Sequence, residues 1–393
     1  MIDMPVGLCR WLEIDLDKLA ANLQKAQQHV GCGVIAVVKN DAYGFGAVEA
    51  ARTFAEAGAV MLAVTTTDEA LELREAGIKA PVLVFTPPQS VQEAACLAKH
   101  GLVATLDGTD TAELLAAAGE PECHIKLNTG MNRFGVEPAA LPGLLADLAA
   151  RPNIKLSGMY SHLATALESD DTFARRQIAE FSRAKDEVIA RGYSDICFHL
   201  ANSAGALKFP EARFNAVRLG SLLYAQLGAA RQHGLDLSEP FCAVGRIAAV
   251  RNLQKGDTVG YGREFTAPGP MRAAVVPFGY GDGFGVQPAA RPLTVKGSVQ
   301  ALSRNLGKLA LGRAGRYVYY QGRPLPVLGR VAMQNMLVDI GDLPLKKGDV
   351  VNVPLRRTAA SAKIPRVYLK GGRFFALRCV SRILQDELEK SVK

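Results

Sequence analysis

The sequence lacks the features that mark membrane, secreted and metal-binding proteins. No apolar stretch reaches the ~18 residues that a membrane span requires, and Met1 to Glu13 has no basic start followed by an apolar run. The seven cysteines are widely scattered, and none forms the C-x-x-C pair of a zinc or redox site. We therefore expect a cytoplasmic protein with reduced cysteines, no metal and no membrane partner.

Positive charge is present but is not gathered into a tract. The formal net charge is +8, and Lys and Arg are spread along the chain without an aromatic-interleaved basic run. Nucleic-acid-binding domains concentrate such residues, so we expect no nucleic-acid partner. Part of this charge is instead available to attract an anionic ligand.

The first part of the chain has the rhythm of a (β/α)8 TIM barrel. At 393 residues the chain has room for a barrel of about 250 residues and a second domain. From about residue 14 to 230, short apolar runs alternate with Ala/Leu/Glu-rich segments of helical period. The eight candidate strands are Val34–Lys39, Met61–Thr65, Val82–Phe85, Val103–Leu106, His124–Leu127, Ser157–His162, Cys197–Leu200 and Val217–Leu222.

After about Leu237, strand-like pieces such as Ile247–Val250 and Ala273–Pro277 follow one another without long helical segments. We expect an all-β domain there. The predicted domains are a barrel over 12–237 and a β domain over 238–393 that includes an N-terminal strand over 1–11. Within it, the Gly-, Arg- and Lys-rich segment 291–323 is predicted as a loop or hairpin insertion, or alternatively as a strongly twisted pair of strands.

Lys39 ends the first candidate strand and precedes a glycine-punctuated turn that contains Tyr43. A lysine in a partly desolvated barrel mouth has a lowered pKa and can form a Schiff base. Taken alone, a solvated lysine at a strand end is the commoner case. However, Arg133, His162, Ser203 and Arg218 are placed with Lys39 at five C-terminal strand ends of one barrel, where barrel enzymes assemble their sites.

The last two strands are followed by small and hydroxyl-bearing residues that suit an anion. Each could be a simple cap, but loops after the final two barrel strands often bind phosphate, and their backbone N–H groups can approach it closely. We therefore expect a phosphorylated cofactor. The residues concerned are Asn202, Ser203, Gly205, Gly220 and Ser221.

The Lys39 turn, the Lys126–Gly135 segment, and the motifs Val259–Gly262, Phe278–Gly283 and Gly329–Met333 occur in the order seen in alanine racemases. The chain resembles that family, the fold-type III pyridoxal 5'-phosphate (PLP) enzymes, over nearly its whole length. The resemblance implies a Schiff base between PLP and Lys39. It implies further PLP contacts from Tyr43, Arg133, His162, Asn202, Ser203, Arg218, Gly220 and Ser221, and a possible carbamylated lysine at Lys126.

The resemblance also implies the reaction, the racemisation of alanine. Two bases must flank the cofactor plane so that one removes the Cα proton and the other returns it. Lys39 is implied as one base and Tyr261 as the other, supplied by the β domain of a partner subunit in a homodimer. Arg133 and Met333 are implied in substrate binding. An arginine such as Arg218 keeps the pyridine nitrogen unprotonated, which favours proton return over transamination.

Several positions depart from the family pattern. Gln334 and Asn128 each replace Asp, Leu167 replaces Asp after the His162 motif, and the family tyrosine near Ala362 is missing. The alternative is therefore a PLP-dependent racemase of broad or altered specificity, acting on serine, lysine or another amino acid. A PLP decarboxylase is disfavoured because Arg218 stands where such enzymes carry a carboxylate, and a PLP-binding barrel without activity would lack the β domain.

Overall fold

The computed structural model describes residues 7–286 and 316–390. The chain separates into two compact units, which are described here one at a time. The barrel unit comprises Leu16–Pro240, and the β unit comprises Met1–Asp15 together with Phe241–Lys393.

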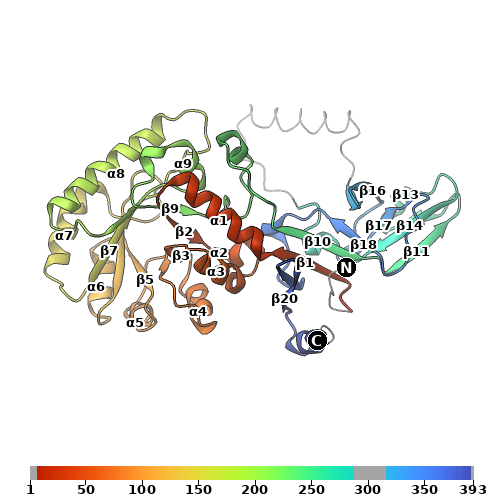
Figure 1. The fold of residues 1–393 in the computed structure, drawn as a ribbon, viewed down its shortest axis with the longest axis horizontal. Helices are drawn as coiled ribbons and strands as arrows, with labels where there is room; N and C mark the ends of the chain where they lie inside the picture. The colour runs from red at the N-terminus through yellow and green to blue at the C-terminus, as the bar shows by residue number, and fades with distance from the viewer. Residues whose placement is uncertain (1–6, 287–315, 391–393) are drawn as a thin grey trace. The chain divides into compact units, whose positions relative to one another are not determined.

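The barrel unit is the predicted (β/α)8 barrel. Its parallel strands run in sequence order, and the first pairs with the last to close the barrel, with helices on the outside (Figure 1). The strands are β2 (Gly33–Val37), β3 (Met61–Val64), β4 (Val82–Val84), β5 (Val103–Leu106), β6 (Glu122–Lys126), β7 (Lys155–Tyr160), β8 (Cys197–His199) and β9 (Ala216–Leu219). The helices are α1 (Leu16–Val30), α3 (Ala47–Glu56), α4 (Thr67–Glu75), α5 (Val91–Lys99), α6 (Thr109–Ala116), α7 (Leu141–Ala149), α8 (Thr172–Ala190) and α9 (Ser203–Lys208).

Most strands end one to three residues before their predicted ends. Lys39 lies two residues after β2, His162 two residues after β7, and Ser221 two residues after β9. The prediction extended each strand through its apolar run, but at this edge the chain already bends into the loops that carry polar side chains. Lys39, His162 and Ser221 therefore lie on loops just beyond the strands, whereas Lys126 and Arg218 lie within β6 and β9.

The barrel interior has an apolar part and a polar part. Side chains of alternate residues point inward because a strand has a period of two. The strands β2 to β5 contribute buried residues such as Ile35, Val37, Ala63 and Leu83. The strands β6 to β9 contribute His124, Lys126, Tyr160, His199 and Arg218, all buried. The polar part of the interior leads to the site described below.

The β unit is built on a ten-stranded sheet in the order β11-β14-β17-β16-β15-β18-β10-β1-β19-β20. Its strands are β1 (Arg10–Asp15), β10 (Phe241–Arg246), β11 (Ala249–Leu253), β14 (Met271–Val276), β15 (Tyr317–Tyr320), β16 (Arg323–Leu328), β17 (Met336–Asp339), β18 (Val350–Val353), β19 (Arg366–Lys370) and β20 (Arg373–Arg378). The short pair β12 (Thr258–Val259) and β13 (Phe265–Thr266) and the helix α11 (Arg382–Lys390) complete the described part.

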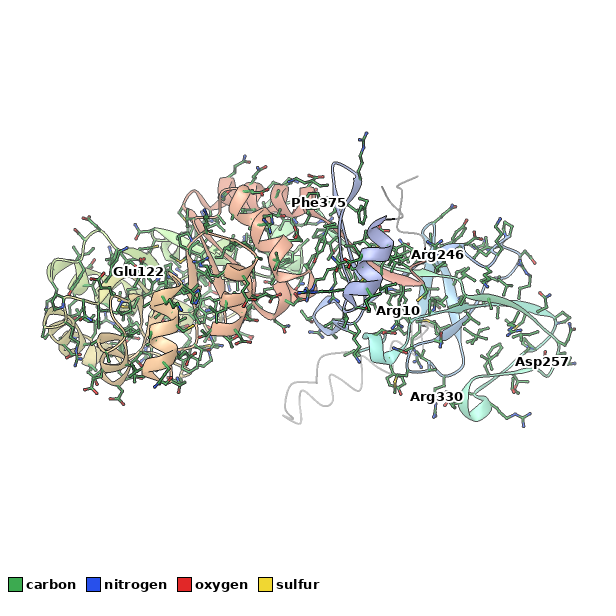
Figure 2. The ribbon with its side chains drawn as sticks, turned by 90° about the horizontal axis from the view of Figure 1, so that it is seen from below. Arg10, Glu122, Arg246, Asp257, Arg330 and Phe375 are labelled. Carbon is green, nitrogen blue, oxygen red and sulfur yellow. The ribbon has the colours of Figure 1, made fainter. Side chains whose placement is uncertain are left out.

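The N-terminal strand was predicted over 1–11, but β1 runs from Arg10 to Asp15. It lies between β10, to which it is antiparallel, and β19, to which it is parallel. Trp11, Leu12 and Ile14 are buried there. Arg10, labelled in Figure 2, forms a 2.9 Å ion pair with the buried Asp282.

The loop or hairpin predicted over 291–323 can be compared with the structure only from residue 316 onward. Residues 287–315 lie outside the described residues, whereas β15 and β16 form an antiparallel hairpin in which Tyr320 pairs with Arg323. Within the described ranges, none of the helices has both the length and the apolar character to cross a membrane.

Candidate active site

Lys39 begins a left-handed turn. The four residues after it, Asn40 to Tyr43, all have φ between 50° and 58° and ψ between 28° and 56°. Left-handed helical geometry costs roughly 1–2 kcal/mol for each L-residue that has a Cβ. Such strain persists only where the surroundings hold it, and it is found most often at functional sites. The direction in which the chain leaves the barrel at Lys39 is therefore fixed by this strained backbone.

The environment of Lys39 favours the neutral amine. Burial lowers the pKa of Lys39 and the nearby cation Arg133 lowers it further, whereas Glu69 acts in the opposite direction. The lowered pKa that the sequence predicts is confirmed, and it is what a nucleophilic lysine requires.

Arg218 lies buried at the end of β9 with nearly all its donors engaged. Its Nη1 lies 2.9 Å from His199 Nδ1 and donates to His199 O, while its Nη2 donates to Ser161 O and Leu200 O. Four of the five guanidinium N–H groups are thereby used, which leaves Nε–H for a ligand as far as contacts among the described residues go. Burial lowers the pKa of Arg218 to about 10, so it remains a cation at neutral pH.

Behind Arg218 lies a histidine pair that the sequence analysis did not predict. His199 Nε2 is 2.9 Å from His124 Nδ1. Because arginine only donates, His199 Nδ1 must accept, so the His199 proton is on Nε2 and is donated to His124. Burial lowers the pKa of both rings, that of His124 to about 4, so both are neutral.

Gly158 makes this arrangement possible, since a Cβ at that position would lie 2.6 Å from three atoms of the His124 ring. Reading strand residues in steps of two would have pointed both side chains into the barrel, but would not have shown that they meet. His124 precedes Lys126 by two positions, and His199 falls on the inward-facing side of its strand.

His162 lies between Arg218 and the loop after β8. Its Nδ1 is 3.2 Å from Arg218 Nη2, and its Nε2 is 3.3 Å from Asn202 Nδ2. Burial, and then Arg218, lower the pKa of His162 well below its ordinary value. Asn202 also caps α9, because its Oδ1 accepts from Gly205 N at 3.0 Å.

The predicted anion site forms a small cradle. Ser203 Oγ accepts from the backbone N–H groups of Gly220 and Leu222, which leaves its own O–H as a donor. Tyr43 Oη lies so close to Gly220 that a Cβ there would be 2.1 Å from it. Burial raises the pKa of Tyr43 to about 12, so this hydroxyl also donates. Ser221 follows directly and is half-buried. The small Gly220 and the hydroxyl donors of Ser203 and Tyr43 fit a phosphate group.

Lys126 lies in the polar interior above Tyr160. Its Nζ donates to Leu127 O at 3.0 Å and is 5.3 Å from the centre of the Tyr160 ring. Burial, Arg218 and Arg133 together lower the pKa of Lys126 to about 7. The site thus gathers cations and neutral histidines, a composition that suits an anionic cofactor.

The loop that carries Arg133 explains one departure from the family pattern. Asn128 Nδ2 donates to Glu137 Oε1 at 2.6 Å, and its Oδ1 accepts from the backbone of Gly130 and Asn132. An aspartate at position 128 would face the Glu137 carboxylate, so an amide fits better. Arg133 is exposed on this loop and acts electrostatically on both Lys39 and Lys126.

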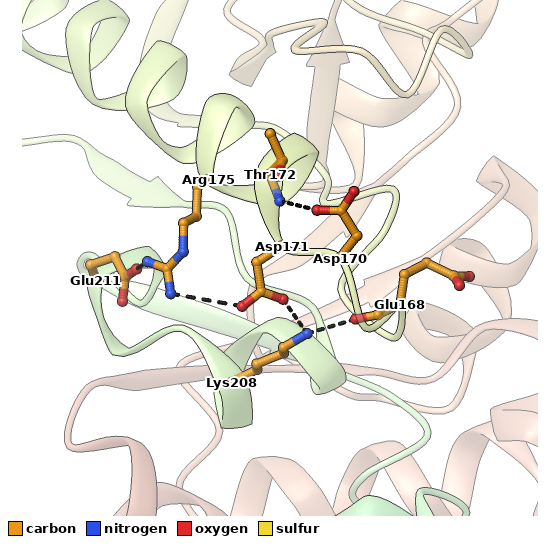
Figure 3. A network of polar contacts seen from close by, with 7 residues as sticks. All are labelled: Glu168, Asp170, Asp171, Thr172, Arg175, Lys208 and Glu211. Atoms are coloured by element: carbon orange, nitrogen blue, oxygen red, sulfur yellow. Dashed lines mark hydrogen bonds and ion pairs between the residues drawn. The ribbon is translucent and has the colours of Figure 1, made fainter.

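The loop after β7 carries Leu167, which is 71% exposed. An ionic network holds the end of this loop (Figure 3). Lys208 of α9 pairs with Asp171 and donates to Glu168 O, and Arg175 links Asp171 to Glu211. The loop is thereby tied to the helix that begins at the phosphate cradle.

Tyr261 and Met333 belong to the β unit and are both largely exposed, at 70% and 59%. Tyr261 stands between Gly260 and Gly262, both with positive φ. Gly281 donates its N–H to Met333 O at 2.9 Å. Gln334 is exposed beside Met333, and Ala362 is exposed with its carbonyl bound by Arg366.

Comparison with known proteins assigns most of the chain to one family. Residues 14–227 match the family described as alanine racemase, N-terminal domain, and residues 242–364 match alanine racemase, C-terminal domain. The chain is 32% identical over 354 residues to an alanine racemase of Nostoc sp.. This alignment covers 87% of this chain and 86% of the Nostoc protein. The chain is 31% identical over 386 residues to alanine racemase 1 of Bacillus subtilis, spanning 94% and 95%.

Solved structures of alanine racemases also superpose on this chain. Alanine racemase of Clostridium difficile 630 superposes with a TM-score of 0.81 at 25% identity, covering 95% of this chain and 99% of that one. Alanine racemase of Bacillus anthracis with bound L-Ala-P superposes with a TM-score of 0.80 at 26% identity, covering 95% and 98%. With the barrel, the Lys39 turn and both domain matches in place, the chain belongs to the alanine racemase family, whose members depend on PLP.

Proposed function

We propose that this chain interconverts L- and D-alanine with PLP as its cofactor. The observation that carries the proposal is the convergence of Lys39, Arg218 and the Ser203 cradle at one end of the barrel. The relatives that match over most of their length are named alanine racemases. They do not favour the alternative of broad or altered specificity.

PLP, when bound, withdraws electrons from the amino acid and acidifies its Cα proton. Lys39 would hold the cofactor covalently and accept or return the proton on one face of Cα. Tyr43, Ser203, Gly220 and Ser221 would hold the phosphate through their hydroxyl and backbone donors.

Around the ring, Arg218 would offer Nε–H to the pyridine nitrogen without giving up its proton. The neutral histidine pair behind it supplies an acceptor rather than a second charge. His162 and Asn202 would lie beside the ring, and Arg133 would contact the ring hydroxyl and the substrate.

A carbamate on Lys126 is part of the proposal. A neutral amine can add CO2, forming an N–C bond and releasing one proton. Burial and Arg218 support this, because they keep the pKa of Lys126 near 7. The resulting anion would compensate the cations around it.

We further propose a homodimer in which Tyr261 and Met333 of one chain complete the site of the other. The barrel unit would then hold the cofactor, and the β unit would serve the partner. The exposure of Tyr261 and Met333 on the β unit supports this arrangement. A cytoplasmic location is supported by the free thiols of all seven cysteines.

The test uses the purified chain loaded with PLP. Borohydride should fix the cofactor to Lys39, as peptide mass spectrometry would detect, and L-alanine should become racemic by chiral chromatography. Serine and lysine serve as comparison substrates. Attachment at another lysine, or turnover of those amino acids but not alanine, would refute the proposal.

A further inference from the structure

Glu69 contacts the Lys39 turn but is absent from the residues assigned so far. It is the third residue of α4, in the next βα unit after Lys39. Its Oε1 accepts from the backbone N–H of Asn40 at 2.5 Å. Its Oε2 accepts from Thr65 N at 2.7 Å and Thr66 N at 3.3 Å. One carboxylate therefore joins the end of β3 to the residue that directly follows Lys39.

Helix capping explains only half of this arrangement. A glutamate at the third helical position commonly accepts from the backbone N–H of its own N-cap residue, here Thr66. The bond to Asn40 reaches a different segment of the chain. Asn40 is also the first of the four left-handed residues, so Glu69 holds the strained turn at its start.

A second glutamate provides a comparison within the same barrel. Glu93 is the third residue of α5. Its Oε2 accepts from Gln89 N at 2.9 Å, and its backbone N–H donates to Oγ of the cap residue Ser90 at 3.2 Å. Its other oxygen accepts from the Thr67 hydroxyl at 2.6 Å. Glu93 thus resembles Glu69 in its helical position and in accepting from the residue before its N-cap, but its other oxygen binds Thr67 of α4 and not the Lys39 turn.

We propose that Glu69 is a positioning residue for Lys39, because its carboxylate fixes the left-handed turn that directs the lysine into the site. This inference rests on the proposed role of Lys39 in holding PLP. Glu69 is also the anion that partly offsets the effect of Arg133 on Lys39. It therefore acts through both the backbone and the charge of its surroundings.

The first experiment measures amide hydrogen exchange in the full chain prepared without PLP. A hydrogen bond to a charged group shifts the equilibrium between the closed and the open backbone by about 10- to 100-fold toward the closed form. Glu69→Ala should therefore speed amide exchange across residues 38–46 by about 10-fold or more. The matched control Glu93→Ala should speed exchange at the start of α5 and leave 38–46 unchanged. This readout needs no activity and stays informative if the racemase proposal fails.

The second experiment follows PLP capture by Lys39 as a function of pH, using borohydride trapping. Glu69→Gln keeps one acceptor oxygen and loses the charge, so the midpoint of capture should move to lower pH, whereas Glu93→Gln should not move it. The Gln variant also serves if Glu69→Ala does not fold. Unchanged exchange over 38–46 in the Glu69 variants, or equal effects from the Glu93 variants, would overturn the proposal.

Discussion

Replacing Gly158 with alanine tests whether the His124 ring fills the barrel interior as described. Gly158 of β7 pairs in register with His124 of β6, and the added Cβ would lie 2.6 Å from its ring atoms. The ring is buried and hydrogen-bonded, so it cannot turn into solvent. Overpacking a core costs about 1–3 kcal/mol, and the lost bond to His199 adds about 1 kcal/mol. We expect a total of about 2–4 kcal/mol.

That loss corresponds to a decrease in Tm of about 4–16 °C for a domain of this size, measurable by thermal unfolding of the PLP-free chain. Gly143→Ala is the control, since Gly143 lies within α7 with nothing within 4 Å of its Cβ position. That change should stabilise the helix by about 0.5–1 kcal/mol. Removing the ring with His124→Ala should relieve the clash, so the double variant should lose less than the sum of both changes.

A Gly158→Ala chain that melts within 1 °C of the parent would show that His124 does not lie against β7. A cost that is strictly additive with that of His124→Ala would equally contradict the contact. PLP affinity is a second readout. Displacing His124 should disturb His199, which accepts a hydrogen bond from Arg218.

The remaining predictions concern pH and the two proposed bases. Burial lowers the pKa of His124, His162 and His199 below the ordinary 6.5, that of His124 to about 4. As pH falls below 6.5, these histidines take up protons in the unfolded chain before they do so in the folded chain. The free energy of unfolding, measured with urea, should therefore decrease by up to ~1.4 kcal/mol per pH unit for each ring. Mixing a Lys39→Ala chain with a Tyr261→Phe chain should restore one working site per heterodimer. The family resemblance implies that Lys39 exchanges the Cα proton of D-alanine and Tyr261 that of L-alanine. In Tyr261→Phe, NMR should therefore still show deuterium entering Cα of D-alanine, while exchange of L-alanine slows by ~10²–10⁴.

Each of these has a clear contrary result. Constant stability from pH 6.5 to 4.5 would mean that the histidines are solvated or charged. No activity after demonstrated subunit exchange would contradict shared sites. Equal loss of exchange for both enantiomers would show that Tyr261 supports geometry and is not a base.

The barrel was predictable because alternating apolar runs and helical segments directly reflect its construction, and all eight strands lie where the runs do. The clustering of His162, Asn202 and Arg218 was also predictable, since polar side chains at the ends of successive strands must meet at one end of a barrel. A Schiff-base lysine and a phosphate site were argued from residue type and position, whereas the other roles rested on family resemblance.

Two parts of the site could not be read from the sequence. Asn and Asp adopt left-handed geometry more often than other residues that have a Cβ, but nothing in the sequence indicates a run of four that continues through Ala42 and Tyr43. The His124–His199 pair joins strands that are distant in sequence. Because each histidine alone resembles an ordinary buried side chain, only closure of the barrel reveals their contact.

The position of β1 has a consequence for how the chain is made. Arg10–Asp15 is synthesised first, yet its partners β10 and β19 begin only at Phe241 and Arg366. All the barrel strands emerge before either partner, so the barrel can close on the ribosome while β1 has nothing to pair with. Such long-range pairing is slow and exposes strand edges. The β unit therefore completes its sheet late, and a fragment that starts at Phe241 would lack a central strand and leave β10 and β19 as open edges prone to aggregation.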